Sequence, residues 1–88
     1  MNIEVLKFSA SWCGPCRVLA QILKDVEGVT NVDIDNNMEQ ARKYNIRNVP
    51  TLVFLKDGVE VHRKSGIMSL SLFNEIMDEI KFSKELNN

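Results

Sequence analysis

Apolar and polar residues along the chain fall into blocks whose repeat changes between that of a strand and that of a helix. Residues 3–8 are apolar-rich and are followed by small residues, which is typical of a strand covered on both faces. Beyond Cys16 the apolar residues recur with helical spacing: Val18, Leu19, Ile22, Leu23 and Val26. This block predicts an amphipathic helix that begins between Cys13 and Cys16 and ends near Gly28.

The middle of the chain predicts a strand and a short helix. Residues 29–34 are strand-like, and the polar cluster 35–37 offers a helix cap, with Gln40 three residues after Asn37 as in a capping box. We expect this helix to run to about Tyr44 and to be closed by Asn45 in the left-handed conformation.

The last third predicts a hairpin and a helix. Residues 51–55 and 59–63 are expected to pair antiparallel around the turn residues 56–58. Ser69 stands where it can cap a helix whose apolar residues repeat the earlier spacing: Leu72, Phe73, Ile76, Met77 and Ile80. We expect residues 84–88 to fray.

The element order is therefore β-α-β-α-β-β-α. Because a crossover between two neighbouring strands is right-handed, the first two strands should lie parallel in one sheet, with helices on both faces. The 88 residues are long enough for one modest core, so residues 1–88 are expected to form a single domain.

Composition narrows the class of partner. Hydrophobic residues make up 44% and charged residues 26% of the chain, and the net charge of −1 provides no basic stripe for nucleic acid. No run approaches the roughly twenty apolar residues that span a bilayer, and no signal-peptide pattern opens the chain. We expect a cytoplasmic monomer without nucleic-acid or membrane partners.

Both cysteines of the chain lie in one pentapeptide, formed by Trp12, Cys13, Gly14, Pro15 and Cys16. A thiol at a helix N-terminus has a lowered pKa, because the helix dipole and unpaired backbone N–H groups stabilise the thiolate. Gly14 permits a tight turn, and Pro15 has its φ preset for the first helical turn. Cys13 is therefore expected to be an exposed, reactive thiolate, and redox chemistry is the favoured reading.

Two other readings of the pair are weaker. A zinc site needs two further ligands, and His62 is the only histidine. A structural disulfide across two intervening residues closes almost no loop, so it removes little entropy from the unfolded chain. Neither a metal nor a cofactor is therefore expected.

The chain resembles the thioredoxins through the motif at 12–16, the run Lys-Tyr-Asn-Ile-Arg-Asn-Val-Pro-Thr at 43–51 and Lys-Asp-Gly at 56–58. The resemblance implies an α/β thioredoxin-like fold and a protein-disulfide reductase in which Cys13 attacks and Cys16 resolves. It also implies thioredoxin reductase as electron donor and ribonucleotide reductase as one substrate. Thioredoxins usually begin with a further strand and helix, so we expect a trimmed, glutaredoxin-sized version with a four-stranded mixed sheet.

The same resemblance assigns a substrate-binding surface. It implies a cis peptide bond between Val49 and Pro50, opposite the cysteines, where the backbone of Val49 would pair with an extended substrate segment. Gly66 matches a small residue that lets the substrate backbone approach, although a plain loop glycine is an equal alternative. Trp12 would shield the sulfurs and offer an apolar docking face, or simply pack on the surface.

Lys7 departs from the family, because thioredoxins place there a buried aspartate that takes the proton from the resolving cysteine. Strand alternation puts Lys7 on the same face as Ile3 and Val5. A protonated amine would stabilise a nearby thiolate and make the pair more oxidising, whereas a desolvated amine would act as a base. A third reading has the side chain extend to the sheet edge and contact nothing.

Two other functions use the same features. A thioredoxin fold can serve as a binding subunit whose redox activity is incidental, and the acceleration of insulin reduction by dithiothreitol separates this from a reductase. The motif also supports an oxidase or isomerase at a higher redox potential, which equilibration with glutathione buffers would reveal.

Overall fold

The computed structural model describes residues 2–82, and the elements follow the predicted order. They are β1 (Ile3–Ser9), α1 (Gly14–Ile22), β2 (Val29–Asp33), α2 (Met38–Lys43), β3 (Thr51–Lys56), β4 (Val59–Ser65) and α3 (Leu70–Phe82). None of the helices among residues 2–82 has both the length and the apolar composition that a bilayer span requires. The expectation for residues 84–88 lies outside the described part of the chain.

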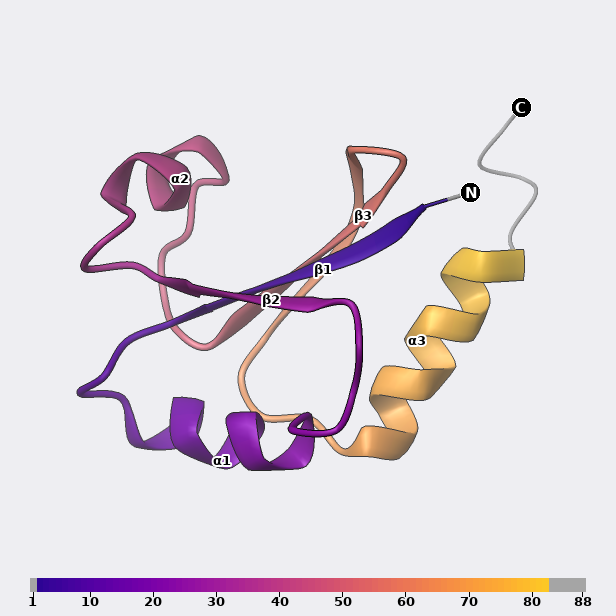
Figure 1. The fold of residues 1–88 in the computed structure, drawn as a ribbon, viewed down its shortest axis with the longest axis horizontal. Helices are drawn as coiled ribbons and strands as arrows, with labels where there is room; N and C mark the ends of the chain where they lie inside the picture. The colour runs from indigo at the N-terminus through magenta and orange to yellow at the C-terminus, as the bar shows by residue number, and fades with distance from the viewer. Residues whose placement is uncertain (1, 83–88) are drawn as a thin grey trace.

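The four strands form one mixed sheet in the order β2-β1-β3-β4, which confirms the predicted sheet (Figure 1). β1 and β2 are parallel, from Val5 opposite Val29 to Ser9 opposite Asp33. β3 is antiparallel to β1 and to β4. The carboxyl ends of β1 and β2 therefore meet the start of β3 at one edge, and the loop after β1 carries the cysteines to this edge.

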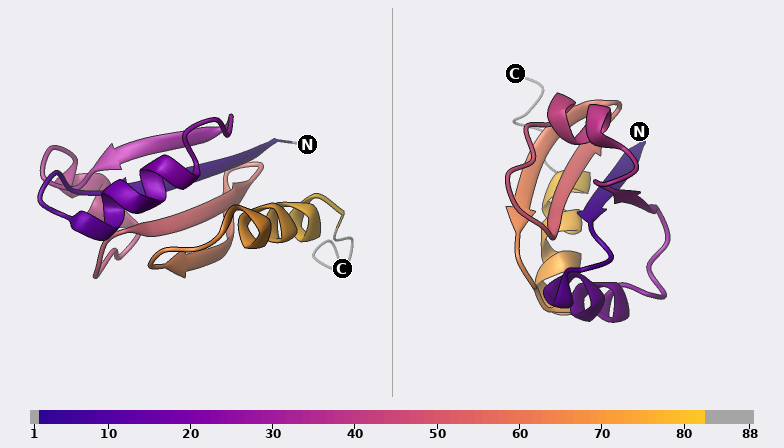
Figure 2. Two further views of the ribbon diagram at one scale, coloured as in Figure 1. Left: turned by 90° about the horizontal axis from the view of Figure 1, so that it is seen from below. Right: turned by 90° about the vertical axis from the view of Figure 1, so that its left-hand side faces the viewer.

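Helices cover both faces of the sheet, as predicted. α1 and α3 lie on one face and α2 on the other (Figures 1 and 2). Alternate residues of the strands point to the two sides, so each face has its own core. The core beneath α1 and α3 consists of Val5, Leu19, Leu23, Leu52, Phe54, Met68, Phe73, Ile76 and Ile80. The core on the α2 side consists of Leu6, Phe8, Val32, Val53 and Leu55.

Helix α1 is shorter than the apolar spacing predicted. It ends at Ile22 rather than near Gly28, and Leu23 is its C-cap. The chain then turns, with the N–H of Val26 donating to the Leu23 carbonyl at 3.0 Å. Val26 still packs against the core beneath α1. This turn brings the Gly28 carbonyl to the N–H of Val5 at 3.0 Å, which starts the parallel pairing of β2.

The expected capping box at α2 is also wrong. Asn37 occupies the N-cap position, but its side chain makes no capping hydrogen bond. Its amide donates instead to the carbonyl of Asp33 at 3.1 Å, which closes the turn after β2.

The other local signals are confirmed. Asn45 has a φ of 55°, and in the hairpin turn Asp57 and Gly58 have φ values of 52° and 85°. Two successive positive φ angles are those of the tight hairpin turn that matches strand twist. The Ser69 hydroxyl accepts the N–H of Leu72 at 3.1 Å, as expected of an N-cap.

Candidate active site

The two cysteines form a disulfide at the N-terminus of α1. Their Cα atoms are 5.3 Å apart, within the range that a disulfide requires. Cys13 is the N-cap residue, and its own N–H donates to the Ala10 carbonyl at 3.2 Å. The sequence explains this start, because Gly14 and Pro15 follow directly, and proline is favoured in the first helical turn.

The sulfur of Cys13 acts as the helix cap. The backbone N–H of Cys16 donates to Cys13 Sγ at 3.1 Å. In the reduced protein the same N–H, together with the positive end of the helix dipole, stabilises a negative charge on this sulfur. No N–H of the described structure is recorded on the sulfur of Cys16, so the arrangement favours Cys13 as the thiolate.

Burial of the cysteines differs from the sequence expectation. Cys13 was expected to be exposed, but it is only 5% exposed and Cys16 only 4%. Both sulfur-bearing residues pack with Ala10, while Ile34 and Val49 cover them. Residues from after β2 and before β3 supply this cover, and a local sequence pattern does not show it. The flanking Trp12, in contrast, is 66% exposed.

The loop before β3 faces the disulfide. The peptide bond between Val49 and Pro50 is cis, as the resemblance implied. The Val49 carbonyl oxygen lies 3.7 Å from Cys13 Sγ. In the disulfide this sulfur carries no proton, so the approach is a contact, and it becomes a hydrogen bond only when Cys13 is a thiol. The Val49 carbonyl is thus a polar neighbour of Cys13 from outside its own loop and helix.

Gly66 is held against the same loop. Its N–H donates to the Pro50 carbonyl at 2.8 Å, directly after β4. Its φ of 89° lies in the region that favours glycine, and a Cβ at this position would meet no atom within 4 Å. The glycine is therefore required by its backbone angle, and the space beside it is open.

A polar network behind this loop was not anticipated from the sequence. The Thr51 hydroxyl donates to the Asn48 carbonyl at 2.7 Å and lies 3.0 Å from the Ser65 hydroxyl. The Ser65 hydroxyl in turn donates to the Asn48 side-chain oxygen at 3.0 Å. These bonds connect Asn48, which precedes the cis bond, to the first residue of β3 and the last residue of β4. The available signal was the hairpin register, which pairs Thr51 with Ser65.

Trp12 is also tied down by a partner that sequence reasoning missed. Its indole N–H donates to the carboxylate of Asp35 at 3.1 Å. The signal was present in the parallel pairing, because residues that follow β1 and β2 meet at the same edge of the sheet. Beside the indole lies a cavity of about 350 Å³, lined by Trp12, Ile34, Ala41, Ile46, Arg47, Asn48 and Val49.

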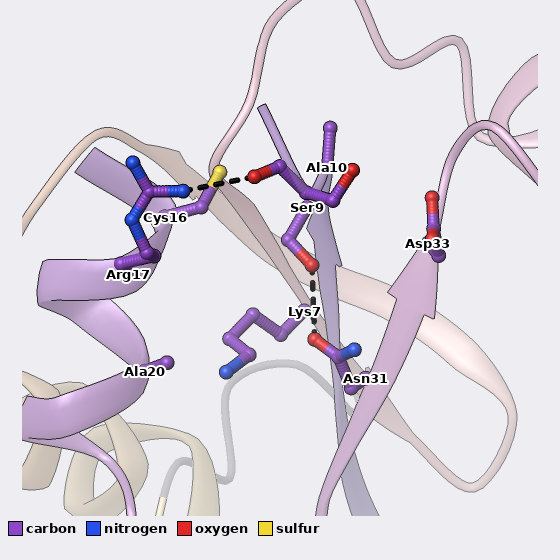
Figure 3. A pocket seen from close by; sticks show the side chains of 9 residues that line it. Lys7, Ser9, Ala10, Cys16, Arg17, Ala20, Asn31 and Asp33 are labelled. Carbon is purple, nitrogen blue, oxygen red and sulfur yellow. Dashed lines mark hydrogen bonds between the residues drawn. The ribbon is translucent and has the colours of Figure 1, made fainter. Parts of the chain in front are cut away.

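Lys7 lies on the other side of the disulfide, beneath α1. It is 9% exposed and lines a cavity of about 300 Å³ together with Cys16 (Figure 3). Burial lowers the pKa of its amine from the ordinary lysine value. Among residues 2–82 the amine has no recorded hydrogen-bond or ion-pair partner. The side chain therefore lies between helix and sheet, and its amine borders the cavity.

The structure therefore brings the sequence-predicted residues together on two sides of one disulfide. Trp12, Val49, Pro50 and Gly66 surround the side toward β3 and the loop after β4, whereas Lys7 lies on the side toward β2. Lys7 instead lines a separate cavity next to Cys16.

Comparisons with known proteins agree with this geometry. The thioredoxin family model matches residues 2–79. A thioredoxin of Staphylococcus epidermidis is 31% identical over 89% of this chain and 82% of its own length. An H-type thioredoxin of Oryza sativa subsp. indica is 38% identical over 90% of this chain and 70% of its own length. A solved mutant thioredoxin of Halobacterium salinarum NRC-1 superposes with a TM-score of 0.84 at 29% identity, over 89% of this chain and 74% of that one.

Proposed function

This chain belongs to the thioredoxin family and carries its redox-active pair of cysteines, and we propose that it reduces disulfide bonds in proteins. One observation carries the proposal: the Cys16 N–H donates to Cys13 Sγ at the N-terminus of α1. This bond and the helix dipole favour the thiolate form of Cys13, which is the nucleophile in thiol-disulfide exchange.

The proposed reaction has two exchange steps. The Cys13 thiolate attacks one sulfur of a substrate disulfide, forms a mixed disulfide and releases the other substrate sulfur as a thiolate. The Cys16 sulfur, deprotonated, then attacks Cys13 Sγ, closes the Cys13–Cys16 disulfide and releases the second substrate thiolate. Two electrons pass to the substrate, whose thiolates take protons from solvent, and the enzyme is left oxidised.

We propose that the substrate lies across the cis loop. The backbone of Val49 is close enough to Cys13 to pair with an extended segment on either side of the disulfide under attack. The open space beside Gly66 leaves room for the substrate backbone to approach this glycine. Trp12, oriented by Asp35, and the adjoining 350 Å³ cavity accept an apolar side chain of the substrate.

For Lys7 we propose the cationic role. Exposed residues such as Asn31 and Arg17 line the same cavity, so water can hydrate the ammonium group and sustain its charge. A cation beside Cys16 stabilises the reduced pair and raises its redox potential. The expected effect of Lys7→Met is a more negative midpoint potential in equilibration with glutathione buffers. An unchanged or more positive value would contradict the cationic role.

The proposed partners are protein disulfides, ribonucleotide reductase among them, and a thioredoxin reductase that returns two electrons to the Cys13–Cys16 pair. We propose the cytoplasm as the compartment, because the dithiol form is maintained where cellular reductants keep thiols reduced. The proposal requires no resident cofactor.

Acceleration of insulin reduction by dithiothreitol tests the activity. The wild-type chain should shorten the lag before insulin precipitates, and the double variant Cys13→Ser, Cys16→Ser provides the matched control. A wild-type chain that behaves like this control would reject the reductase and favour a binding module.

The two cysteine roles are tested by trapping. Cys16→Ser should accumulate a mixed disulfide with a substrate protein through Cys13, because the resolving sulfur is gone. Cys13→Ser should accumulate none, since Cys16 lacks the N–H contact that Cys13 receives. Stable adducts through Cys16 would reverse the assignment.

A further inference from the structure

The cavity beneath α1 is built from two sides. β1 and β2 contribute Lys7, Ser9, Asn31 and Asp33, while α1 contributes Cys16, Arg17 and Ala20 (Figure 3). Ala10 and Ser11 from the connecting loop complete the lining. The volume of about 300 Å³ is at the small end of the range found for ligand sites. Figure 3 shows the Lys7 side chain extending into the space between Ala20 and Asn31.

The amine of Lys7 is the unusual group in this cavity. More than nine-tenths of the residue is buried, yet residues 2–82 provide its amine with no recorded hydrogen-bond acceptor. No fully buried side-chain nitrogen or oxygen of the described residues lacks a partner, so solvent reaches this amine within the cavity. The Lys7 amine can therefore donate hydrogen bonds to a molecule in the cavity.

Acceptors around the cavity already receive hydrogen bonds from other residues. The Asn31 side-chain oxygen accepts the Ser9 hydroxyl at 3.0 Å. The two carboxylate oxygens of Asp33 accept the N–H of Asp35 at 2.9 Å and the amide of Asn36 at 3.2 Å. None of these recorded bonds comes from Lys7, and each oxygen keeps a second lone pair.

Donors, in contrast, remain available. The amide NH₂ of Asn31 makes no recorded bond within residues 2–82. Arg17 uses one terminal nitrogen on the Ser11 carbonyl at 2.8 Å, which leaves further N–H groups of its guanidinium. A ligand with acceptor oxygens and negative charge would therefore use these donors.

The charges around the cavity select among anions. Lys7 and Arg17 are cations and Asp33 is an anion, so the charged side chains that line the cavity have a net charge of +1. A monoanion with two oxygens matches this charge and the available donors, whereas a phosphate dianion would place its second charge near Asp33. We propose that the cavity is a binding site for a small carboxylate, held by Lys7 with Asn31 and Arg17.

Binding should depend on pH through Lys7. Because burial lowers the pKa of this amine, its charge is lost at a lower pH than that of an exposed lysine. The other titratable or charged groups lining the cavity are Cys16 and Arg17 on α1 and Asp33 on β2, and Leu52 lies opposite Lys7 on β3. With Cys16 in the disulfide, loss of the charge on Lys7 is the change that should weaken the binding of an anion.

The experiment is a titration of the oxidised protein with sodium acetate, followed by NMR at constant ionic strength maintained with chloride. The signals to follow are the Lys7 Cε and Nζ resonances and the Asn31 side-chain amide. Acetamide, which has the shape of acetate without its charge, serves as the ligand control. Lys64→Met removes an exposed lysine of β4 and is the matched control for Lys7→Met.

Acetate should give saturable shifts at both residues, and acetamide should give none. Lys7→Met should weaken binding roughly tenfold to hundredfold, the range expected for one charge-assisted hydrogen bond. Asn31→Ala, at an exposed strand position, should weaken it without altering the fold, and Lys64→Met should leave it unchanged. Affinity should fall as the pH rises through the pKa of Lys7.

Three results would overturn the proposal. Shifts that stay linear in acetate concentration would mean that water alone fills the cavity. Equal affinity in Lys7→Met and wild type would place the anion elsewhere. Phosphate binding as tightly as acetate would refute the selection for a carboxylate. The oxidised protein undergoes no exchange in this assay, so its outcome is separate from that of the reductase tests.

Discussion

Replacing Lys7 with methionine should stabilise the oxidised protein at neutral pH. Methionine retains a long, flexible side chain that fills a similar volume, but it has no charge to be hydrated. Lys7 is 9% exposed, and its amine has no recorded acceptor among residues 2–82. Solvent still reaches the amine, because no fully buried side-chain nitrogen or oxygen of the described residues lacks a partner. Methionine should therefore recover only part of the cost of burying a polar group, and we expect a gain of about 1 kcal/mol in unfolding free energy.

The gain should depend on pH in a defined direction. Burial lowers the pKa of Lys7 in the folded protein, whereas in the unfolded chain it is about 10.4. Between these two values the unfolded state binds more protons, so the wild-type protein becomes more stable as the pH rises. The advantage of Lys7→Met should therefore be complete below the folded pKa and should shrink as the pH approaches the unfolded value.

Urea unfolding of both proteins, followed by circular dichroism at neutral and at alkaline pH, measures this effect. A gain of about 1 kcal/mol corresponds to a midpoint shift of up to roughly 1 M urea, because the slope for small proteins is about 1–3 kcal/mol per M. Lys64→Met removes an exposed lysine and should change stability by no more than about 0.5 kcal/mol. A variant that is less stable than the wild type at neutral pH, or whose gain persists unchanged at alkaline pH, would refute the argument.

Three further substitutions test other parts of the structure. Thr51→Val removes the hydroxyl that donates to Asn48 at 2.7 Å, and should lower the unfolding free energy by about 1–2 kcal/mol in urea titrations and slow insulin reduction by loosening the cis loop. Phe54→Ala empties a fully buried site, and thermal unfolding should show a loss of about 3–5 kcal/mol. Glu60→Gln breaks the exposed ion pair with Arg63 and should alter stability by less than about 1 kcal/mol. The pair lowers the pKa of Glu60, so this small contribution should disappear as the pH falls through that pKa and should weaken in high salt.

Some sequence signals were ambiguous for a physical reason. Val26 continues the helical spacing of the block that follows Cys16, yet it lies beyond the end of α1. It packs against the same core as Leu19 and Leu23 because the turn after Leu23 folds back beneath the sheet. Burial against one core gives the same apolar spacing whether the backbone is helical or turned, so periodicity could not locate the end of the helix.

The capping residues also show how far local sequence can predict structure. Ser69 and Asn37 are both favourable cap residues, but only Ser69 makes a capping hydrogen bond. The amide of Asn37 is drawn to the Asp33 carbonyl, which the end of β2 presents to it. Local propensity names residues that can cap a helix, and the neighbouring strand decides which of them does.

The sequence by itself determined the order of elements, the hairpin turn and the reactive pair at a helix start. These features depend on residues within a few positions of one another, whose periodicity and backbone preferences are local. Only the tertiary structure decided what surrounds the pair. It buried the sulfurs, placed the Val49 carbonyl beside Cys13 from 36 residues away, joined Trp12 to Asp35, and enclosed Lys7 in a cavity next to Cys16. Such contacts arise from the pairing of strands and the packing of α1 on the sheet, and no local pattern records them.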